Sequence, residues 1–125
     1  MSGKSLWDLA PLDVGRTPKS LLEEQAVFLT EATKGVLLGG VDSTSSTLGF
    51  QHDLFIQVPS LNNYTYTVLS IEHGIGLYPV HVSSQAAGVQ RECSDEQSFE
   101  DTIGRILSSA PVRKAVASLL AQVNS

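Results

Sequence analysis

The stretch of sequence that decides the fold runs from Phe50 to Val82 and reads FQHDLFIQVPSLNNYTYTVLSIEHGIGLYPVHV. Apolar and polar side chains alternate over residues 48–58, 64–73 and 77–83, and a period of two is that of a strand with one buried face. Short turns separate the three segments. The sequence therefore predicts a three-stranded antiparallel meander.

The turns set the pairing that we expect between these strands. Asn62 and Asn63 suit a two-residue hairpin loop, because asparagine tolerates the positive φ that such loops need. That loop places Leu54 opposite Ile71, and the next turn places Ile71 beside Tyr78. A slip of one residue would move the apolar set of one strand to the other side of the sheet, so the hydrophobic pattern favours this register.

A fourth strand is expected over residues 36–43, before the meander. It joins the next strand through a turn at residues 44–47, which places Val41 beside Phe50. One face of the four-stranded sheet then collects the apolar side chains and is the predicted core face. Its members are Leu37, Val41, Phe50, Leu54, Ile56, Val58, Leu69, Ile71, Tyr78, Val80 and Val82.

An N-terminal helix precedes the strands. Thr17 can accept a hydrogen bond as its N-cap, Pro18 suits its first position, and Gly35 ends it. Residues 1–16 precede it as an irregular arm, and we expect the apolar side chains of the arm, Trp7 among them, to lie on the body of the protein.

Two C-terminal helices follow a loop at residues 84–93. Ser94 and Gln97 form a capping-box pattern for the first, and the second begins after the break at Pro111. The predicted fold is a single two-layer α+β domain over residues 17–125. Its four-stranded antiparallel meander is flanked by one N-terminal and two C-terminal helices, in the order α-β-β-β-β-α-α.

The composition excludes several functional classes. The 125 residues carry a net charge of −5, and the eight cations are scattered, so a nucleic-acid partner is not expected. The sequence shows no secretory signal and no apolar run of the length that spans a bilayer. A single cysteine fits a reducing compartment, so we expect a cytoplasmic protein without a membrane partner. No nucleotide motif or catalytic constellation is present, and no cofactor or catalytic residue is predicted.

His52 and His73 are the first candidate site. The predicted register makes them cross-strand neighbours at one end of the core face, with Gly39 on the other side of His52. Two adjacent imidazoles could bind a metal or a small ligand, or transfer protons. A zinc site needs at least a third protein ligand, and neither His81, on the opposite face, nor Cys93, in the loop, is expected to supply it. No metal site is therefore assigned, and two solvated histidines at the edge of the sheet remain the alternative.

Asp53 and Glu72 are the second candidate, because the same register places them directly opposite each other on the outer face. Like charges across a ladder are destabilising unless something compensates them. A raised carboxyl pKa in acid–base catalysis, a cation from a partner, or simple solvation at the end of the sheet would each explain the pair.

The outer face is the third candidate, because it is more apolar than a solvated sheet face should be. Phe55, Tyr66, Val68 and Leu77 are predicted there as contact residues, with Asp53 and Glu72 as their polar neighbours. The arm or one of the helices could cover this face instead.

The leading hypothesis is a non-enzymatic protein-interaction or regulatory domain that forms a homodimer or docks on another protein. A small-molecule or metal-binding protein, or a weak enzyme with a site at His52 and His73, is the second. An acidic chaperone-type or immunity-type protein that sequesters a partner is the third.

Overall fold

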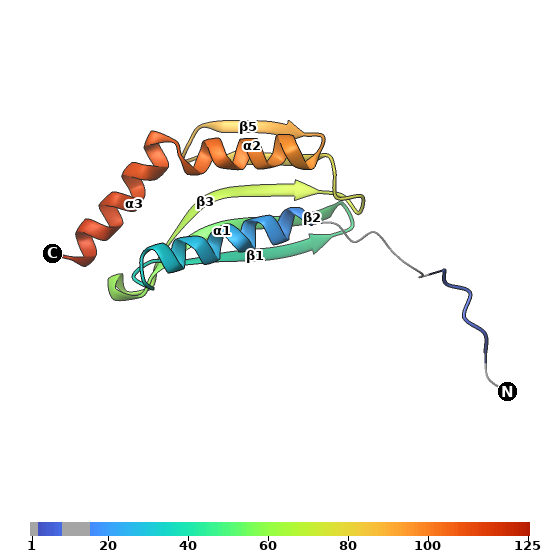
Figure 1. The fold of residues 1–125 in the computed structure, drawn as a ribbon, viewed down its shortest axis with the longest axis horizontal. Helices are drawn as coiled ribbons and strands as arrows, with labels where there is room; N and C mark the ends of the chain where they lie inside the picture. The colour runs from blue at the N-terminus through green and yellow to red at the C-terminus, as the bar shows by residue number, and fades with distance from the viewer. Residues whose placement is uncertain (1–2, 9–15) are drawn as a thin grey trace.

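The computed structural model describes residues 3–8 and 16–125. It is an α+β fold with one antiparallel sheet and three helices, and its strands follow one another across the sheet in chain order, β1-β2-β3-β4-β5. Figure 1 shows α1 and α2 side by side over one face of this sheet, with α3 diverging from them. The elements are α1 (Pro18–Ala32), β1 (Leu38–Ser46), β2 (Gly49–Val58), the 3-10 turn η1 (Pro59–Leu61), β3 (Tyr64–His73), β4 (Val80–Ser84), β5 (Val89–Cys93), α2 (Glu96–Leu107) and α3 (Ala110–Val123).

The sheet has five strands, and the prediction of four is wrong. Residues 84–93, expected as a loop, contain β5, which pairs with β4. β5 is an edge strand, and the three residues between Val89 and Cys93 are exposed. Only Val89 and Cys93 of this strand are apolar. A mostly solvated edge strand lacks the alternation by which strands are recognised.

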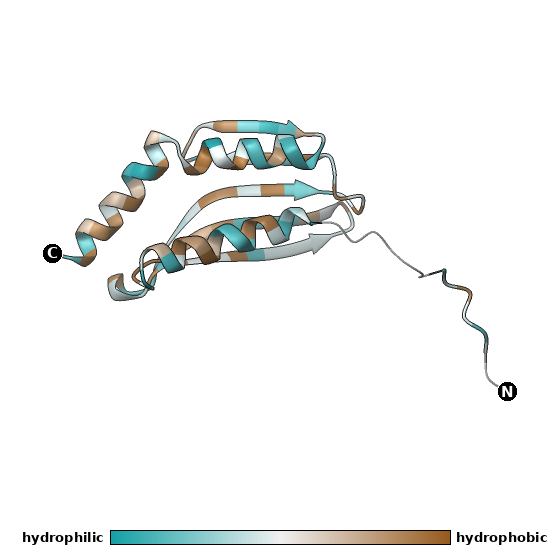
Figure 2. Ribbon diagram, in the orientation of Figure 1, coloured by the Kyte–Doolittle hydropathy of each residue, from teal (hydrophilic) through white to brown (hydrophobic). Residues whose placement is uncertain are grey.

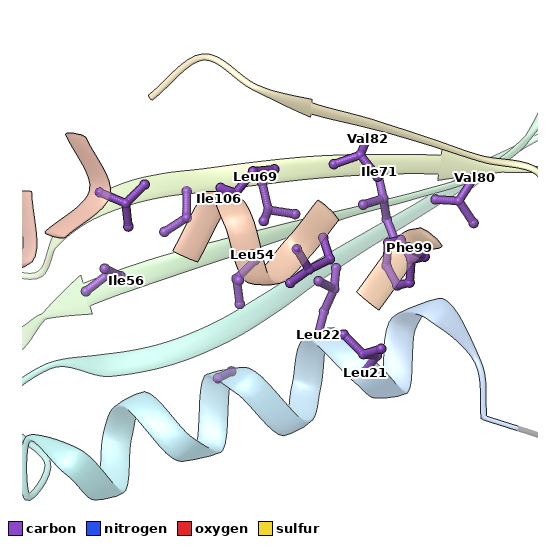
Figure 3. Close-up of a cluster of buried hydrophobic side chains, with 14 of the residues drawn as sticks. Leu21, Leu22, Leu54, Ile56, Leu69, Ile71, Val80, Val82, Phe99 and Ile106 are labelled. Carbon is purple, nitrogen blue, oxygen red and sulfur yellow. The ribbon is translucent and has the colours of Figure 1, made fainter. Parts of the chain in front are cut away.

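The core lies between the helices and one face of the sheet. Leu21 and Leu22 of α1 and Phe99 and Ile106 of α2 converge on the strand residues, as Figure 3 shows. The strands contribute their alternate apolar side chains, including Leu54, Ile56, Leu69, Ile71, Val80 and Val82. Burying side chains of this kind stabilises a fold by roughly 1.5–3 kcal/mol each.

The predicted registers between strands are wrong by an even number of residues, except between residues 55–58 of β2 and 64–67 of β3, where the shift is odd. Leu54 lies opposite Leu69, where Ile71 was expected. Val41 lies opposite Leu54, where Phe50 was expected. Similarly, Ile71 lies opposite Val82 instead of Tyr78. An even shift keeps each side chain on its expected face, so most of the predicted core face is correct although the pairs are not.

The hairpin between β2 and β3 explains one of these shifts. Pro59 has no N–H for the ladder and begins η1, so β2 ends at Val58. Asn62 and Asn63 follow with φ of 58° and 59°, as the sequence indicated, but the 3-10 turn lengthens the loop. A β-bulge then shifts the register between Leu54 and Phe55 and leaves Val68 without a partner in the ladder.

The helix starts follow local capping chemistry. Thr17 caps α1 and accepts a hydrogen bond from the N–H of Ser20 at 3.0 Å, which confirms that prediction. The predicted cap of the next helix is wrong by one residue, because Asp95 accepts from the N–H of Ser98 at 2.8 Å. A carboxylate is at least as good an N-cap as the hydroxyl of Ser94.

The described part of the arm does not lie on the body. Leu6 is 92% exposed and Trp7 is 80% exposed, which contradicts the predicted packing of Trp7. The remaining apolar residues of the predicted arm, Leu9, Leu12 and Val14, lie outside the described residues.

Candidate functional site

His52 and His73 meet at one end of the core face. His52 lies opposite Ile71, and His73 lies opposite Phe50, so the two histidines are diagonal neighbours and not the directly opposed pair that we predicted. Their ring centroids are 5.3 Å apart and their planes are inclined by 35°. The two Nε2 atoms are 3.3 Å apart. Strands β2 and β3 therefore bring the two Nε2 atoms within hydrogen-bonding distance of each other.

The outer ring nitrogens are held by the backbone and by a serine. Nδ1 of His73 lies 2.7 Å from the carbonyl oxygen of Gly74, which can only accept, so this nitrogen carries a proton. In the neutral state Nε2 of His73 then accepts from the N–H at Nε2 of His52. Nδ1 of His52 accepts in turn from the hydroxyl of Ser43, 2.8 Å away. The hydrogen bonds thus run in one direction from Ser43 to Gly74.

Ser43 is a member of the site that the sequence analysis missed. It lies opposite His52 on β1, where Gly39 was expected. Because the turn at residues 47–48 is tight, β1 extends to Ser46, and its pairing with β2 is shifted by four residues from the register that we predicted. The signal for this hairpin in the sequence was Gly49, which pairs with Ser46 directly after the turn. Gly49 adopts a φ of 138°, which favours glycine.

Burial determines the protonation state of His52. Its side chain is only 6% exposed, and desolvation lowers its pKa below the usual 6.5, with the nearby charges of His73 and Lys19 acting in the same direction. Glu23 on α1 and Asp53 on the outer face oppose this shift. A neutral His52 at pH 7 offers a ring nitrogen as a ligand or a base.

The remaining candidate ligands lie elsewhere. His81 is on the outer face, opposite Glu72 and Glu92. Cys93 is fully buried at the end of β5, not in a loop, and its Sγ lies 3.5 Å from the hydroxyl of Thr102. Within residues 3–8 and 16–125 no three His, Cys, Asp or Glu side chains are grouped so that they could hold a metal ion.

The predicted opposition of Asp53 and Glu72 is wrong. Asp53 lies opposite Ser70 and Asp42, and Glu72 lies opposite Gln51 and His81. The side-chain amide of Gln51 donates a hydrogen bond to Asp53 at 3.1 Å. Asp53 and Glu72 are thus diagonal neighbours, and the directly opposed like charges are Asp42 and Asp53. Asp42 is exposed, and repulsion between carboxylates in contact with water is small.

The apolar contact residues predicted on the outer face do not share that face. Val68 is 3% exposed in the bulge, and Tyr66, opposite Ile56, is on the core side. Leu77 has a φ of 69° in the turn before β4 and belongs to no strand. Phe55 alone stays there, with its ring over Gly40. The bulge is the reason, since one extra residue reverses the alternation of β3 on the Tyr64 side of Val68.

The outer face is instead a polar surface. Two rows of side chains cross all five strands on it. One row is Thr44, Gln51, Glu72, His81 and Glu92, and the other is Asp42, Asp53, Ser70, Ser83 and Gln90. None of these side chains is fully buried, and no lysine or arginine is among them.

The apolar hollow of the molecule is on the helix side. A groove of about 270 Å³ lies between α1 and α3, over the middle of the sheet. Its lining is almost wholly apolar and comprises Gln25, Ala26, Phe28, Leu29, Ala32, Leu54, Phe55, Ile56, Val68, Leu107, Val112 and Val116. A second hollow of about 410 Å³ lies between α3 and the β2–β3 hairpin, and Tyr64 and Tyr66 line it. Two of the predicted contact residues, Phe55 and Val68, thus border the first groove, and Tyr66 borders the second.

Comparison of the chain with protein-family models, with curated proteins and with solved structures finds no match in any of the three. None of the helices formed by the described residues combines the length and the apolar character that crossing a membrane requires.

Proposed function

We propose that this chain is a non-enzymatic protein-interaction domain that forms a homodimer through its helix-bearing face. The observation that carries this proposal is an exposed apolar ridge on α1, directly beside the apolar groove. Val27 and Phe28, the ridge, are each 54% exposed. Figure 2 shows apolar residues gathered in the second half of α1 and recurring along α3.

The ridge is unusual for a surface helix. Leu21, Leu22 and Ala26 already form the buried stripe of α1, and Val27 and Phe28 lie outside it. A helix that contacts only its own sheet carries polar residues at such positions. Adjacent exposed apolar side chains beside a hollow are typical of a contact surface.

Ridge and groove complement each other in a two-fold dimer. Because both lie on the same face of one chain, a single two-fold axis can place the ridge of each copy in the groove of the other. The charges agree with this arrangement. Glu23 and Glu31 flank the ridge, while Arg113 and Lys114 are exposed at the start of α3, on the far side of the groove. The acidic flank of one copy would then meet the basic pair of the other.

The test is the solution mass, measured by light scattering at low and high salt. We expect a dimer of twice 13.4 kDa that persists at high salt, because apolar burial is not screened. Phe28→Asp should give a folded monomer, since it introduces a charge on the ridge. Leu48→Asp is the matched control, because Leu48 is 92% exposed in the turn between β1 and β2 and does not line the groove, so this variant should leave the dimer intact.

Two results would overturn the proposal. A wild-type protein that stays monomeric at all concentrations would exclude the homodimer and leave the helix face for a different protein, as in a partner-sequestering chaperone. A dimer that survives Phe28→Asp would show that the ridge on α1 is not the interface. Circular dichroism of both variants establishes that each is folded.

A further inference from the structure

The two Nε2 atoms of His52 and His73 have the separation of two ligands on one metal ion. Two nitrogens at about 2.0 to 2.1 Å from a tetrahedral zinc ion are about 3.3 to 3.4 Å from each other. The observed separation is 3.3 Å, at the long end for an N–H···N hydrogen bond. We infer that His52 and His73 form a binding site for a divalent late transition-metal ion, with zinc and nickel as the probes that fit their imidazole donors.

The groups behind the two rings fit this role. A histidine that binds a metal commonly donates its other ring N–H to a carbonyl or another oxygen, which fixes the orientation of the ring. Gly74 already accepts from Nδ1 of His73 at 2.7 Å. When the ion binds, His52 shifts its proton from Nε2 to Nδ1 and donates it to Oγ of Ser43, which lies 2.8 Å away. The proton is conserved, and the exposed Ser43 hydroxyl turns its own hydrogen to solvent.

The surroundings hold both rings before any ion arrives. The ring of Phe50 lies against that of His73, with centroids 5.5 Å apart and planes inclined by 31°. His52 is enclosed by the core, being 6% exposed. Rings that are positioned in advance lose little conformational freedom on binding, which favours affinity.

The site is open, with two protein donors. Since no cluster of three ligating side chains exists within the described residues, water or a small molecule would complete the coordination shell. A surface hollow of about 520 Å³, which His73 and Phe50 help to line, offers the approach. The charged groups near His52 are one cation, Lys19 of α1, and two carboxylates, Glu23 of α1 and Asp53 of β2. We therefore expect weaker binding than at a closed four-ligand site.

The test is calorimetric titration of zinc chloride and of nickel chloride into the untagged full chain at neutral pH. We expect one ion per chain. His73→Ala should abolish the binding, and His73→Gln is the second variant should the first not fold. His81→Ala, which removes the histidine of the outer face, is the matched control and should bind as the wild type does. Ser43→Ala should weaken the affinity about tenfold, because it removes the support of one ligand.

A second measurement needs no variant. Cobalt(II) added to the wild-type protein should shift or broaden the NMR signals of the ring protons of His52 and His73 before those of His81. The inference is overturned if binding is not saturable, if it survives His73→Ala, or if the signals of His81 respond first. The metal titrations and the mass measurement are independent experiments. Failure of the metal-site inference would therefore leave the proposed dimer untouched, and the reverse also holds.

Discussion

The hydroxyl of Tyr78 is buried and has no hydrogen-bond partner among the described residues. The ring of Tyr78 meets that of Phe99 edge to face, with centroids 6.3 Å apart. A buried hydroxyl without a partner costs the protein about 1 to 3 kcal/mol. Burial raises the pKa of Tyr78 above its usual 10.0, and the nearby Glu96 and Asp95 act in the same direction.

Tyr78→Phe should therefore stabilise the protein. We expect the free energy of unfolding to rise by about 1 kcal/mol, because the ring contact remains and the unsatisfied oxygen is removed. Urea denaturation followed by circular dichroism measures this change. A loss of stability would show instead that the hydroxyl is hydrogen-bonded in solution.

The same variant should change the response of the protein to alkaline pH. The folded-state pKa of Tyr78 is higher than the unfolded value of 10.0, so the folded protein holds this proton more tightly. The corresponding stability is fully present below pH 10.0 and is lost as the pH rises through the folded-state pKa. Above pH 10.0 the free energy of unfolding of the wild type should therefore fall more steeply than that of Tyr78→Phe, so that the difference between the two widens. A difference that stays constant with pH would contradict the assignment.

At the scale of the elements, α1 approaches β1 at Gly39. A Cβ built on this residue would lie 2.4 Å from the carbonyl oxygen of Ala26, which is backbone and cannot give way. A Cβ on Gly104 of α2 would meet no atom within 4 Å. The same substitution should therefore have opposite effects at the two positions.

Gly39→Ala should lower the free energy of unfolding by about 1 to 3 kcal/mol, because it pushes the helix away from the sheet. Gly104→Ala should raise it by about 1 kcal/mol, because alanine is the better helix former and nothing obstructs its methyl group. Chemical denaturation of the two variants beside the wild type measures both changes. Equal effects of the same sign would contradict the close contact between α1 and β1.

Alternation of apolar and polar residues predicts which face of a strand is buried, whereas the register between strands depends on the turns. Alternation identified β2 and β3 and placed Leu54, Ile56 and Leu69 on the buried face, because the side-chain period of a strand does not depend on its partner. The register depends on the turns, and the 3-10 turn at Pro59 and the bulge at Val68 leave little trace in the alternation. The predicted placement of Tyr66 and Val68 on the outer face is wrong for that reason.

The candidate site shows the same division. His52 and His73 were correctly expected to be close, because a register error of two residues leaves both on one face and near each other. Ser43 was missed, since its position opposite His52 depends on the hairpin turn at residues 47–48. The groove between α1 and α3 could not be predicted at all, because it depends on the angle at which α3 leaves α2.

At the scale of the whole molecule, Trp7 is the only tryptophan and is 80% exposed. Its fluorescence should have the emission of an indole in water, and acrylamide should quench it readily. Because the proposed interface involves α1 and α3 and not Trp7, we expect the emission to be independent of protein concentration. A shift to shorter wavelength on concentration would place Trp7 in the contact, and Trp7→Phe would then weaken the dimer.

The first edge of the sheet also has a consequence for the chain in a crowded cell. The N–H of Gly39 on the edge strand β1 donates to Oγ1 of Thr30 at 2.9 Å, so it points away from β2 toward α1. Unpaired edge groups of this kind recruit strands from other chains and begin aggregation. The hydroxyl of Thr30 satisfies one such group in the folded protein. A strand of another chain cannot pair at Gly39 unless α1 first releases this N–H.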